Sequence, residues 1–144
     1  GGDASSGPGR PVEHGHGCRC VEVVIEGVAM VHLAGTKMSK SLGNLDFVDA
    51  LRREWDPRVI RLAISAHHYR HEWEWHRGLL DSATARLELW SSTQNGSSDP
   101  AVLDDVRDAL DDDLDAPAAM AVLDRAARAG RRVTAGAALL GVNV

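Results

Sequence analysis

Lysine is scarce in this chain of 144 residues: its 16 lysine and arginine side chains comprise two lysines and 14 arginines. Aromatic residues are also few, with four tryptophans, one tyrosine and one phenylalanine, and there are two cysteines. No run of about 18 consecutive apolar residues occurs, so the sequence predicts no membrane-spanning helix. The first residues, Gly1-Gly2-Asp3, lack the basic and apolar regions of a signal peptide. We therefore expect a cytoplasmic protein that does not insert into membranes.

Both lysines lie in one short segment, residues 37–41, with the sequence KMSKS, and Leu-Gly-Asn follows at residues 42–44. Lysine is a compact, mobile cation that can follow a phosphate during a reaction, whereas the planar arginine side chain suits a fixed oxyanion. Ser39 and Ser41 can add hydroxyl donors, and Gly43 allows a sharp backbone turn. The segment therefore predicts a loop that binds the phosphates of ATP. A solvated basic loop between two elements is the alternative interpretation.

The two cysteines lie in a cluster with two histidines: His14, His16, Cys18 and Cys20. These residue types bind zinc, but structural zinc sites usually place two to four residues between the paired cysteines, and one residue separates them here. An irregular, exposed segment is the favoured interpretation, with a zinc site as the alternative. We assign no metal ligand in this chain.

Composition divides the chain into three parts. Residues 1–27 are rich in Gly, Ser, Pro and His and predict an irregular segment, although the β-branched stretch Val21–Glu26 can form a short strand. Residues 28–45 predict a strand, Val28–Leu33, that runs into the lysine loop. Residues 46–144 predict a bundle of five or six helices. The expected fold class is thus mainly α, with one or two short strands.

Aspartate precedes four of the expected helices, and proline follows it within two residues at three of them. An aspartate at the N-cap accepts a hydrogen bond from a free N–H of the first turn, and proline suits the first helical positions. The four caps are Asp46, Asp56 (before Pro57), Asp99 (before Pro100) and Asp115 (before Pro117). A further helix is expected from about Trp73 to Trp90. The helix after Asp115 is expected to end near Gly130, and a short one from about Thr134 to Leu140 closes the chain.

Two polar clusters have both a structural and a chemical interpretation. His67 and His68 stand beside Tyr69 and near two tryptophans, which suggests metal or acid–base chemistry. Such residues at the end of a helix more often pack the interhelical turn. The run Asp111–Asp115 can bind a hard cation, or it can form an acidic helix end and cap the next helix. The structural interpretation is favoured for both clusters.

The distribution of charge argues against a nucleic-acid partner. The net charge is −5, and residues 46–144 hold 17 acidic and 12 basic side chains. Residues 99–115 contain eight aspartates and a single arginine. Because binding to a polyphosphate backbone depends on lysine and arginine, this surface predicts repulsion of tRNA.

The residues from Met30 to about Val144 resemble the C-terminal portion of the cysteinyl-tRNA synthetase superfamily, which belongs to the class I aminoacyl-tRNA synthetases. Within it, the likeness is greatest to the mycothiol ligases, which join cysteine to glucosaminyl-inositol. The superfamily's N-terminal nucleotide-binding fold, its HIGH-type signature and its zinc ligands have no counterpart here. Residues 1–26 also do not match the family's segment before the lysine loop. The segments that carry the likeness are residues 37–44, 60–63, 67–70, 73–75, 83–90, 113–119 and 139–142.

This resemblance implies a two-step reaction in which ATP and cysteine form cysteinyl-adenylate and an amine then attacks it. The implied small-molecule partners are ATP, cysteine and glucosaminyl-inositol, and zinc is expected for full-length members. Lys37 and Lys40 are implied to be catalytic. The implied nucleotide-binding residues are Lys37, Met38, Ser39, Lys40, Ser41, Met30 and Val31, although Ala29 stands where the family has glycine.

Three hypotheses follow. The leading one is a C-terminal fragment of a cysteine ligase of mycothiol biosynthesis that is inactive alone. The second is a fragment of a cysteinyl-tRNA synthetase, for which a basic or aromatic anticodon-reading region would be expected. The third is a non-catalytic helical module that binds a partner.

Overall fold

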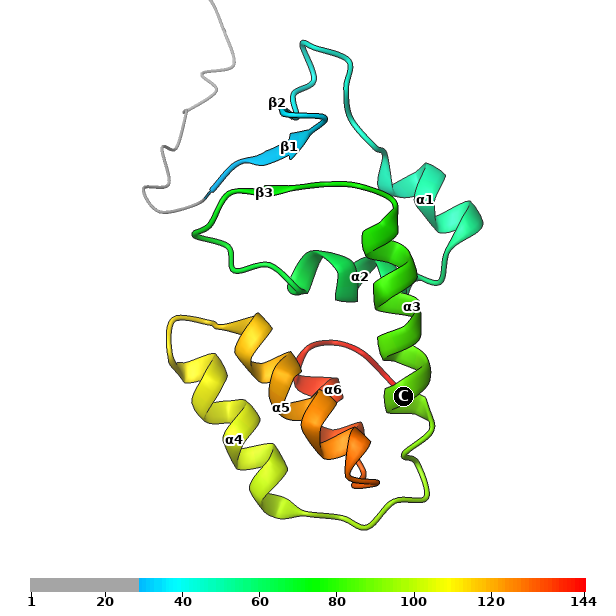
Figure 1. Ribbon diagram of the computed structural model, residues 1–144, viewed down its shortest axis with the longest axis vertical. Helices are drawn as coiled ribbons and strands as arrows, with labels where there is room; N and C mark the ends of the chain where they lie inside the picture. Colours follow the sequence, from blue (N-terminus) through cyan, green and yellow to red (C-terminus); the bar gives the residue numbers. More distant parts are fainter. Residues whose placement is uncertain (1–28) are drawn as a thin grey trace, which may run out of the picture.

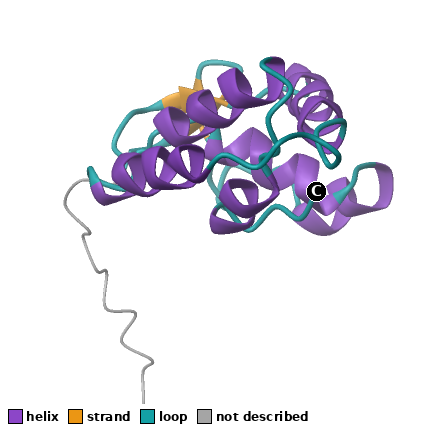
Figure 2. Cartoon of the chain, turned by 90° about the horizontal axis from the view of Figure 1, so that it is seen from below, coloured by secondary structure: helices purple, strands orange, loops and turns teal. Residues whose placement is uncertain are grey.

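The computed structural model describes residues 29–144 (Figure 1). The expected strand at Val21–Glu26 and the cluster of His14, His16, Cys18 and Cys20 lie outside the described residues. Helices dominate the described part and the strands form one small patch (Figure 2). The elements are β1 (Val31–Leu33), β2 (Thr36–Lys37), α1 (Val48–Glu54), α2 (Pro57–Ser65), β3 (Trp73–Glu74), α3 (Gly78–Ser91), α4 (Pro100–Asp111), α5 (Ala116–Arg128) and α6 (Thr134–Leu139). The expected mainly α fold class is confirmed.

The three strands form one sheet in the order β2-β1-β3. β1 and β2 are antiparallel and are joined by Ala34 and Gly35, whose φ angles are 51° and 74°. A two-residue turn with both φ angles positive matches the right-handed twist of the strands it joins, and glycine tolerates this conformation best. β3 runs parallel to β1, and Val31 lies opposite Trp73. The lysine loop therefore starts from a sheet whose third strand comes from a distant part of the sequence.

Strand β3 contradicts the expectation of a helix beginning near Trp73. The side chains alternate instead, with Trp73 half-buried, Glu74 exposed and Trp75 buried, which is the period of a strand. The backbone N–H of Trp75 donates to the carbonyl of His32 at 2.7 Å. Since β1 supplies these hydrogen bonds, the extended conformation prevails, and α3 begins only at Gly78.

Three of the four expected aspartate caps are confirmed. The carboxylates of Asp56, Asp99 and Asp115 accept from first-turn N–H groups at 2.8, 3.0 and 2.9 Å. Asp46 is the exception, because α1 begins at Val48 and has no side-chain cap. Its carboxylate accepts from the indole Nε1–H of Trp75 at 2.6 Å. A bond to Trp75, the residue after strand β3, has thus replaced the expected local one.

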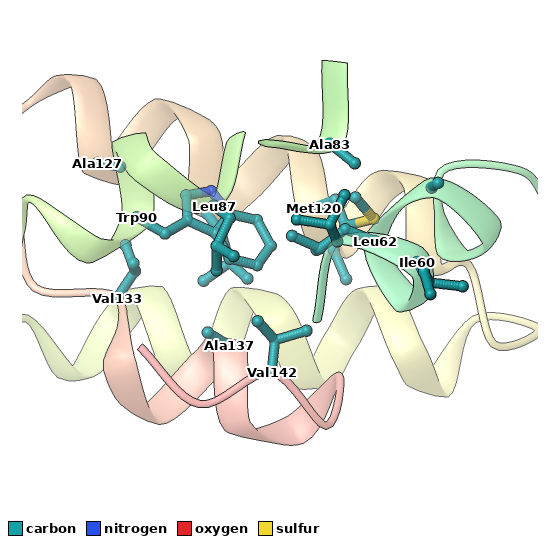
Figure 3. Close-up of a cluster of buried hydrophobic side chains, with 14 of the residues drawn as sticks. Ile60, Leu62, Ala83, Leu87, Trp90, Met120, Ala127, Val133, Ala137 and Val142 are labelled. Carbon is teal, nitrogen blue, oxygen red and sulfur yellow. The ribbon is translucent and has the colours of Figure 1, made fainter. Parts of the chain in front are cut away.

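The core lies where α2 and α3 meet the α4–α6 group, with side chains from several helices pointing toward one another (Figure 3). Trp90 at its centre is fully buried, and its Nε1–H donates to the carboxylate of Asp124 at 2.9 Å. Arg86 also bonds that carboxylate, at 3.1 Å, so the buried charge is paired. The largest fully buried side chains are Trp90, Leu62, Leu80, Met120, Leu123, Val106, Val133 and Val142. No helix within residues 29–144 is both long and apolar enough to cross a membrane.

Candidate functional site

The lysine loop is closed by the side-chain amide of Asn44. Its Oδ1 accepts from the backbone N–H of Ser39 at 2.9 Å, and its Nδ2 donates to the carbonyl of Lys37 at 3.1 Å. Gly43 has a φ of 65°, a left-handed conformation that favours glycine, and its N–H donates to the carbonyl of Lys40 at 3.3 Å. One amide thus ties together the start and the end of the loop.

The two serines of the loop are engaged with the loop itself. The hydroxyl of Ser39 accepts from the N–H of Leu42 at 3.3 Å and lies 3.3 Å from the hydroxyl of Ser41. These bonds shape the backbone between the lysines. A bound phosphate would therefore have to share the serine hydroxyls with the loop.

Lys37 and Lys40 are exposed. Neither forms an ion pair with another residue of 29–144. Lys37 ends β2, where its backbone pairs with His32, and Lys40 lies in the turn that follows. The loop thus presents two charges to solvent from a backbone that is closed by hydrogen bonds. This arrangement suits a polyanion such as a triphosphate.

Met38 joins the loop to the sheet and to the apolar interior. Its N–H donates to the carbonyl of Val31 at 2.9 Å, and its half-buried side chain packs on the edge of the core. A groove of about 310 Å³ opens beside it. The groove is lined almost entirely by apolar side chains: Val31, Met38, Val48, Leu51, Ile60, Ile64, Trp73 and Trp75, with Asp46 as the one acidic residue.

Met30 and Val31 lie at the base of this arrangement. Their carbonyls accept from the N–H groups of Trp73 at 3.3 Å and Met38 at 2.9 Å. The preceding residue, Ala29, donates its N–H to the carbonyl of Tyr69 at 2.9 Å. The sheet therefore brings Val31 and Met38 together, while Met30 keeps a side chain that is 45% exposed.

Comparison with known proteins adds the family. Residues 18–85 match the family model described as the class I (C) tRNA synthetase catalytic domain. An L-cysteine:1D-myo-inositol 2-amino-2-deoxy-alpha-D-glucopyranoside ligase of Streptomyces avermitilis is 54% identical over 100 residues. Ligases of the same name from Nocardiopsis dassonvillei and Streptosporangium roseum are 55% and 53% identical over 101 and 98 residues. Over residues 18–85 the chain belongs to the class I tRNA synthetase family, and over about 100 residues it is similar to these ligases.

The match covers two-thirds of this class I synthetase chain and 24% of the Streptomyces avermitilis ligase, with similar shares for the other two. The chain thus spans about a quarter of the length of the curated relatives it matches. The family model begins at residue 18, upstream of Met30, where the resemblance was expected to start. The expectation that residues 1–26 do not match the family's segment before the lysine loop is therefore wrong for residues 18–26.

Within the synthetase domain, the sequence did not indicate the residues whose hydrogen bonds support the lysine loop, which are Asn44, Asp46 and Trp75. The sequence motif gives Asn44 no role, yet its amide closes the loop. The bond between Trp75 and Asp46 joins the residue after β3 to the segment that follows the loop. The alternation of Trp73, Glu74 and Trp75 was the available signal for a strand.

The histidine cluster packs the turn between α2 and β3. The ring of His67 lies 4.0 Å from the indole of Trp73, nearly parallel to it, and its Nδ1 is 3.1 Å from the carbonyl of Ala63. Burial lowers the pKa of His67, which favours the neutral ring. Tyr69 and Arg70 reach across to Asp113. These contacts agree with the structural interpretation of the cluster.

The acidic run also makes structural contacts, because Asp113 pairs with Arg70 and Asp115 caps α5. No group of three histidine, cysteine or carboxylate side chains within residues 29–144 is placed to hold a metal ion. The described residues therefore do not fit the zinc that the family resemblance implies.

Proposed function

We propose that this chain is part of an ATP-dependent ligase that joins cysteine to the amine of glucosaminyl-inositol. The observation that supports it is the closed loop with two exposed lysines, in a family whose relatives are named for that ligation. In the first step the carboxylate of cysteine attacks the α-phosphorus of ATP, which gives cysteinyl-adenylate and pyrophosphate. In the second, the amine attacks the acyl carbon, which gives the amide and AMP.

Lys37 and Lys40 act in the first step. Their ammonium groups contact the β- and γ-phosphates and stabilise the charge that builds on the departing pyrophosphate. Cations held in place before the reaction lower the barrier more than they strengthen ground-state binding. Because Asn44 closes the backbone between Lys37 and residue 44, little reorganisation of the loop is needed when ATP arrives. Met38, Ser39 and Ser41 form the rest of the phosphate-side surface.

The adenine ring lies along the backbone at Met30 and Val31. The carbonyls of both residues already accept bonds within the chain, so the base is recognised through the remaining backbone groups and the exposed side chain of Met30. Ala29 adds a methyl group where the family has glycine. The apolar groove beside Met38 is close enough to the loop to hold part of the nucleotide away from water.

The acceptor is a small amine and not tRNA. The helical part of the chain is acidic, with 17 acidic and 12 basic side chains in residues 46–144. Such a surface gains little from the counterion release that drives binding to nucleic acids. The relatives' printed names specify the amino sugar as the partner of cysteine.

The experiment that tests this proposal uses the longest reading frame that contains the chain. The product is supplied with ATP and cysteine, and AMP release is compared with glucosaminyl-inositol and with tRNA as acceptor. Turnover with the amino sugar supports the ligase. Turnover with tRNA alone would identify a cysteinyl-tRNA synthetase, and no turnover with either would favour a non-catalytic helical module.

The 144-residue chain by itself is expected to bind ATP weakly, with a Kd on the order of 1 mM, and not to form cysteinyl-adenylate. Binding is measured from amide chemical shifts of residues 37–44, with AMP as the control ligand because it lacks the β- and γ-phosphates. Equal shifts with AMP and ATP would contradict the phosphate role of the lysines. Cysteine-dependent exchange of pyrophosphate into ATP by this chain would contradict its inactivity.

A further inference from the structure

Two segments that are far apart in the sequence meet at the turn between α4 and α5. Arg70 donates from Nε to one carboxylate oxygen of Asp113 at 2.6 Å and from Nη2 to the other at 2.9 Å. The hydroxyl of Tyr69 donates to the same carboxylate at 2.6 Å. These bonds, those from Arg70 first, lower the pKa of Asp113 to about 2. A two-pronged pair of this kind fixes orientation as well as charge.

The backbone at Asp113 and at the next residue has an unusual conformation. Asp113 and Leu114 have φ angles of 55° and 54°, both in the left-handed region that non-glycine residues rarely adopt. The next residue, Asp115, is tied to α5 through the N–H of Ala118. Two successive residues in this conformation persist only where their surroundings enforce it. The turn therefore offers Arg70 and Tyr69 a fixed anchor.

The anchored segment in turn supports the lysine loop. The carbonyl of Tyr69 accepts from the N–H of Ala29 at 2.9 Å, at the start of the chain leading into β1. Four residues after Tyr69, the N–H of Trp73 donates to the carbonyl of Met30, and β3 then pairs with β1. β1 accepts the hydrogen bond from the base of the loop. A continuous series of bonds thus runs from the α4–α5 turn to the loop.

We propose that Asp113 is a positioning residue for the ATP loop, acting through Tyr69 and Arg70 on strands β3 and β1. It touches neither lysine and no reacting atom. Its role is to hold the segment from residue 69 to residue 75 so that β1 keeps its place beneath the loop. This inference rests on the proposed function, because it assigns a purpose to the placement of a loop that binds ATP.

The test compares Asp113→Asn with Asp112→Asn in the 144-residue chain. Asp112 is the adjacent exposed aspartate, and its side chain makes no hydrogen bond or ion pair with another residue of 29–144. Hydrogen exchange is measured at the amides of Ala29 and Trp73, with the amides of Leu87 and Met120 as reference. We expect Asp113→Asn to raise exchange at the first two and leave the reference amides unchanged. A general loss of stability would raise exchange at all four, and that outcome would contradict positioning.

The second readout is ATP affinity, from the amide shifts of residues 37–44. Asp113→Asn is expected to weaken ATP binding roughly three- to tenfold, while Asp112→Asn leaves it unchanged. Equal affinity in both variants would overturn this inference and leave the proposed function standing. No ATP binding by the unaltered chain would overturn the phosphate role of the loop itself, and the positioning role with it. The two failures are therefore distinguishable.

A milder variant keeps the test possible if Asp113→Asn does not fold. Tyr69→Phe removes one hydrogen bond to Asp113 from a side chain that is 37% exposed, and it leaves the Arg70 pair in place. It is expected to move exchange at Ala29 and ATP affinity in the same direction as Asp113→Asn, by a smaller factor. If Tyr69→Phe folds and changes neither quantity while Asp113→Asn changes both, Arg70 alone transmits the effect and the role of Tyr69 is refuted.

Discussion

The region of the sheet and the loop, residues 29–75, and the helical region, residues 78–144, differ in how they treat apolar side chains. The first region exposes six large ones: Met30, Leu42, Phe47, Val48, Ile64 and Tyr69. The second exposes two, Leu114 and Leu139, and contains most of the fully buried core. The helical region therefore buries most of its apolar residues in the core that it shares with α2, while the region with the candidate site leaves an apolar groove open beside the lysine loop.

The two regions are also held by different forces. The helical region is held by close packing around Trp90, with one paired buried carboxylate at Asp124. In residues 29–75, α1 and α2 also pack in the core, but the lysine loop and the sheet are held by directional bonds that involve Asn44, Asp46 and Asp113. Packing energy spreads over many contacts, whereas a hydrogen bond depends on a limited range of distance and angle. A loop that must place two charges for a ligand benefits from the second kind of support.

The largest expected effect is a loss of folding stability when the core of the helical region is altered. Leu123→Ala removes a fully buried side chain and should lower the free energy of unfolding by about 2–5 kcal/mol, because a cavity remains. Urea unfolding followed by circular dichroism measures this change. The control, Leu139→Ala, alters a side chain that is 47% exposed and should stay within about 0.5 kcal/mol. A cost for Leu123→Ala no greater than that of the control would refute the central place of α5 in the core.

The next largest expected effect is on the rate of adenylate formation. Lys40→Ala, in the product of the longest reading frame, should slow cysteine-dependent exchange of pyrophosphate into ATP by roughly a hundredfold or more. Its unfolding free energy should hardly change, since Lys40 is exposed and without an ion pair in residues 29–144. Arg53→Ala, on the exposed side of α1, serves as the control for loss of one positive charge. An unchanged rate for Lys40→Ala would remove the lysine from the mechanism.

A third effect separates the shape of the loop from its charge. Asn44→Ala deletes both bonds that close the loop and should weaken ATP binding by up to roughly thirtyfold, since the two lost bonds are worth about 1 kcal/mol each. Both lysines remain. Exchange of the Ser39 amide should rise while the core amides stay protected. Asn95→Ala, at an exposed position in the turn after α3, provides the control. Equal ATP affinity in the two variants would show that the loop needs no closure.

The smallest expected effect is a loss of folding stability at low pH, when Asp113 is protonated. The pKa of Asp113 is lowered from 3.8 to about 2 by the hydrogen bonds of Arg70 and Tyr69, so the folded chain favours the ionised form. Its contribution to stability is complete above about pH 4 and is lost as the pH falls from 3.8 toward 2, because the unfolded chain takes up the proton first. Titration of the Asp113 carboxyl carbon by NMR checks the midpoint. Arg70→Gln should raise that midpoint toward 3.8, and a midpoint near 3.8 in the unaltered chain would show that the pair does not form.

Local sequence was sufficient to predict the role of a residue where its hydrogen-bond partner lies within one helical turn. Asp56, Asp99 and Asp115 cap helices because each carboxylate bonds an N–H two or three residues away. Local sequence was insufficient to predict the roles of Asp46 and Trp73, since their partners, Trp75 and β1, are distant in the sequence. Asp46 has the same residue type and the same kind of position as the other three, and a bond to Trp75 decided its role.

The lysine loop, the mainly helical fold and the family were determined by the amino-acid sequence alone, because lysine spacing, apolar periodicity and helix caps act over a few residues. Tertiary structure decided that Asn44 closes the loop, that Trp73–Glu74 forms a strand, and that Asp113 meets Tyr69 and Arg70. The last two pairings join residues some forty positions apart. A pattern read along the chain cannot specify them, because their geometry exists only once the helices have packed.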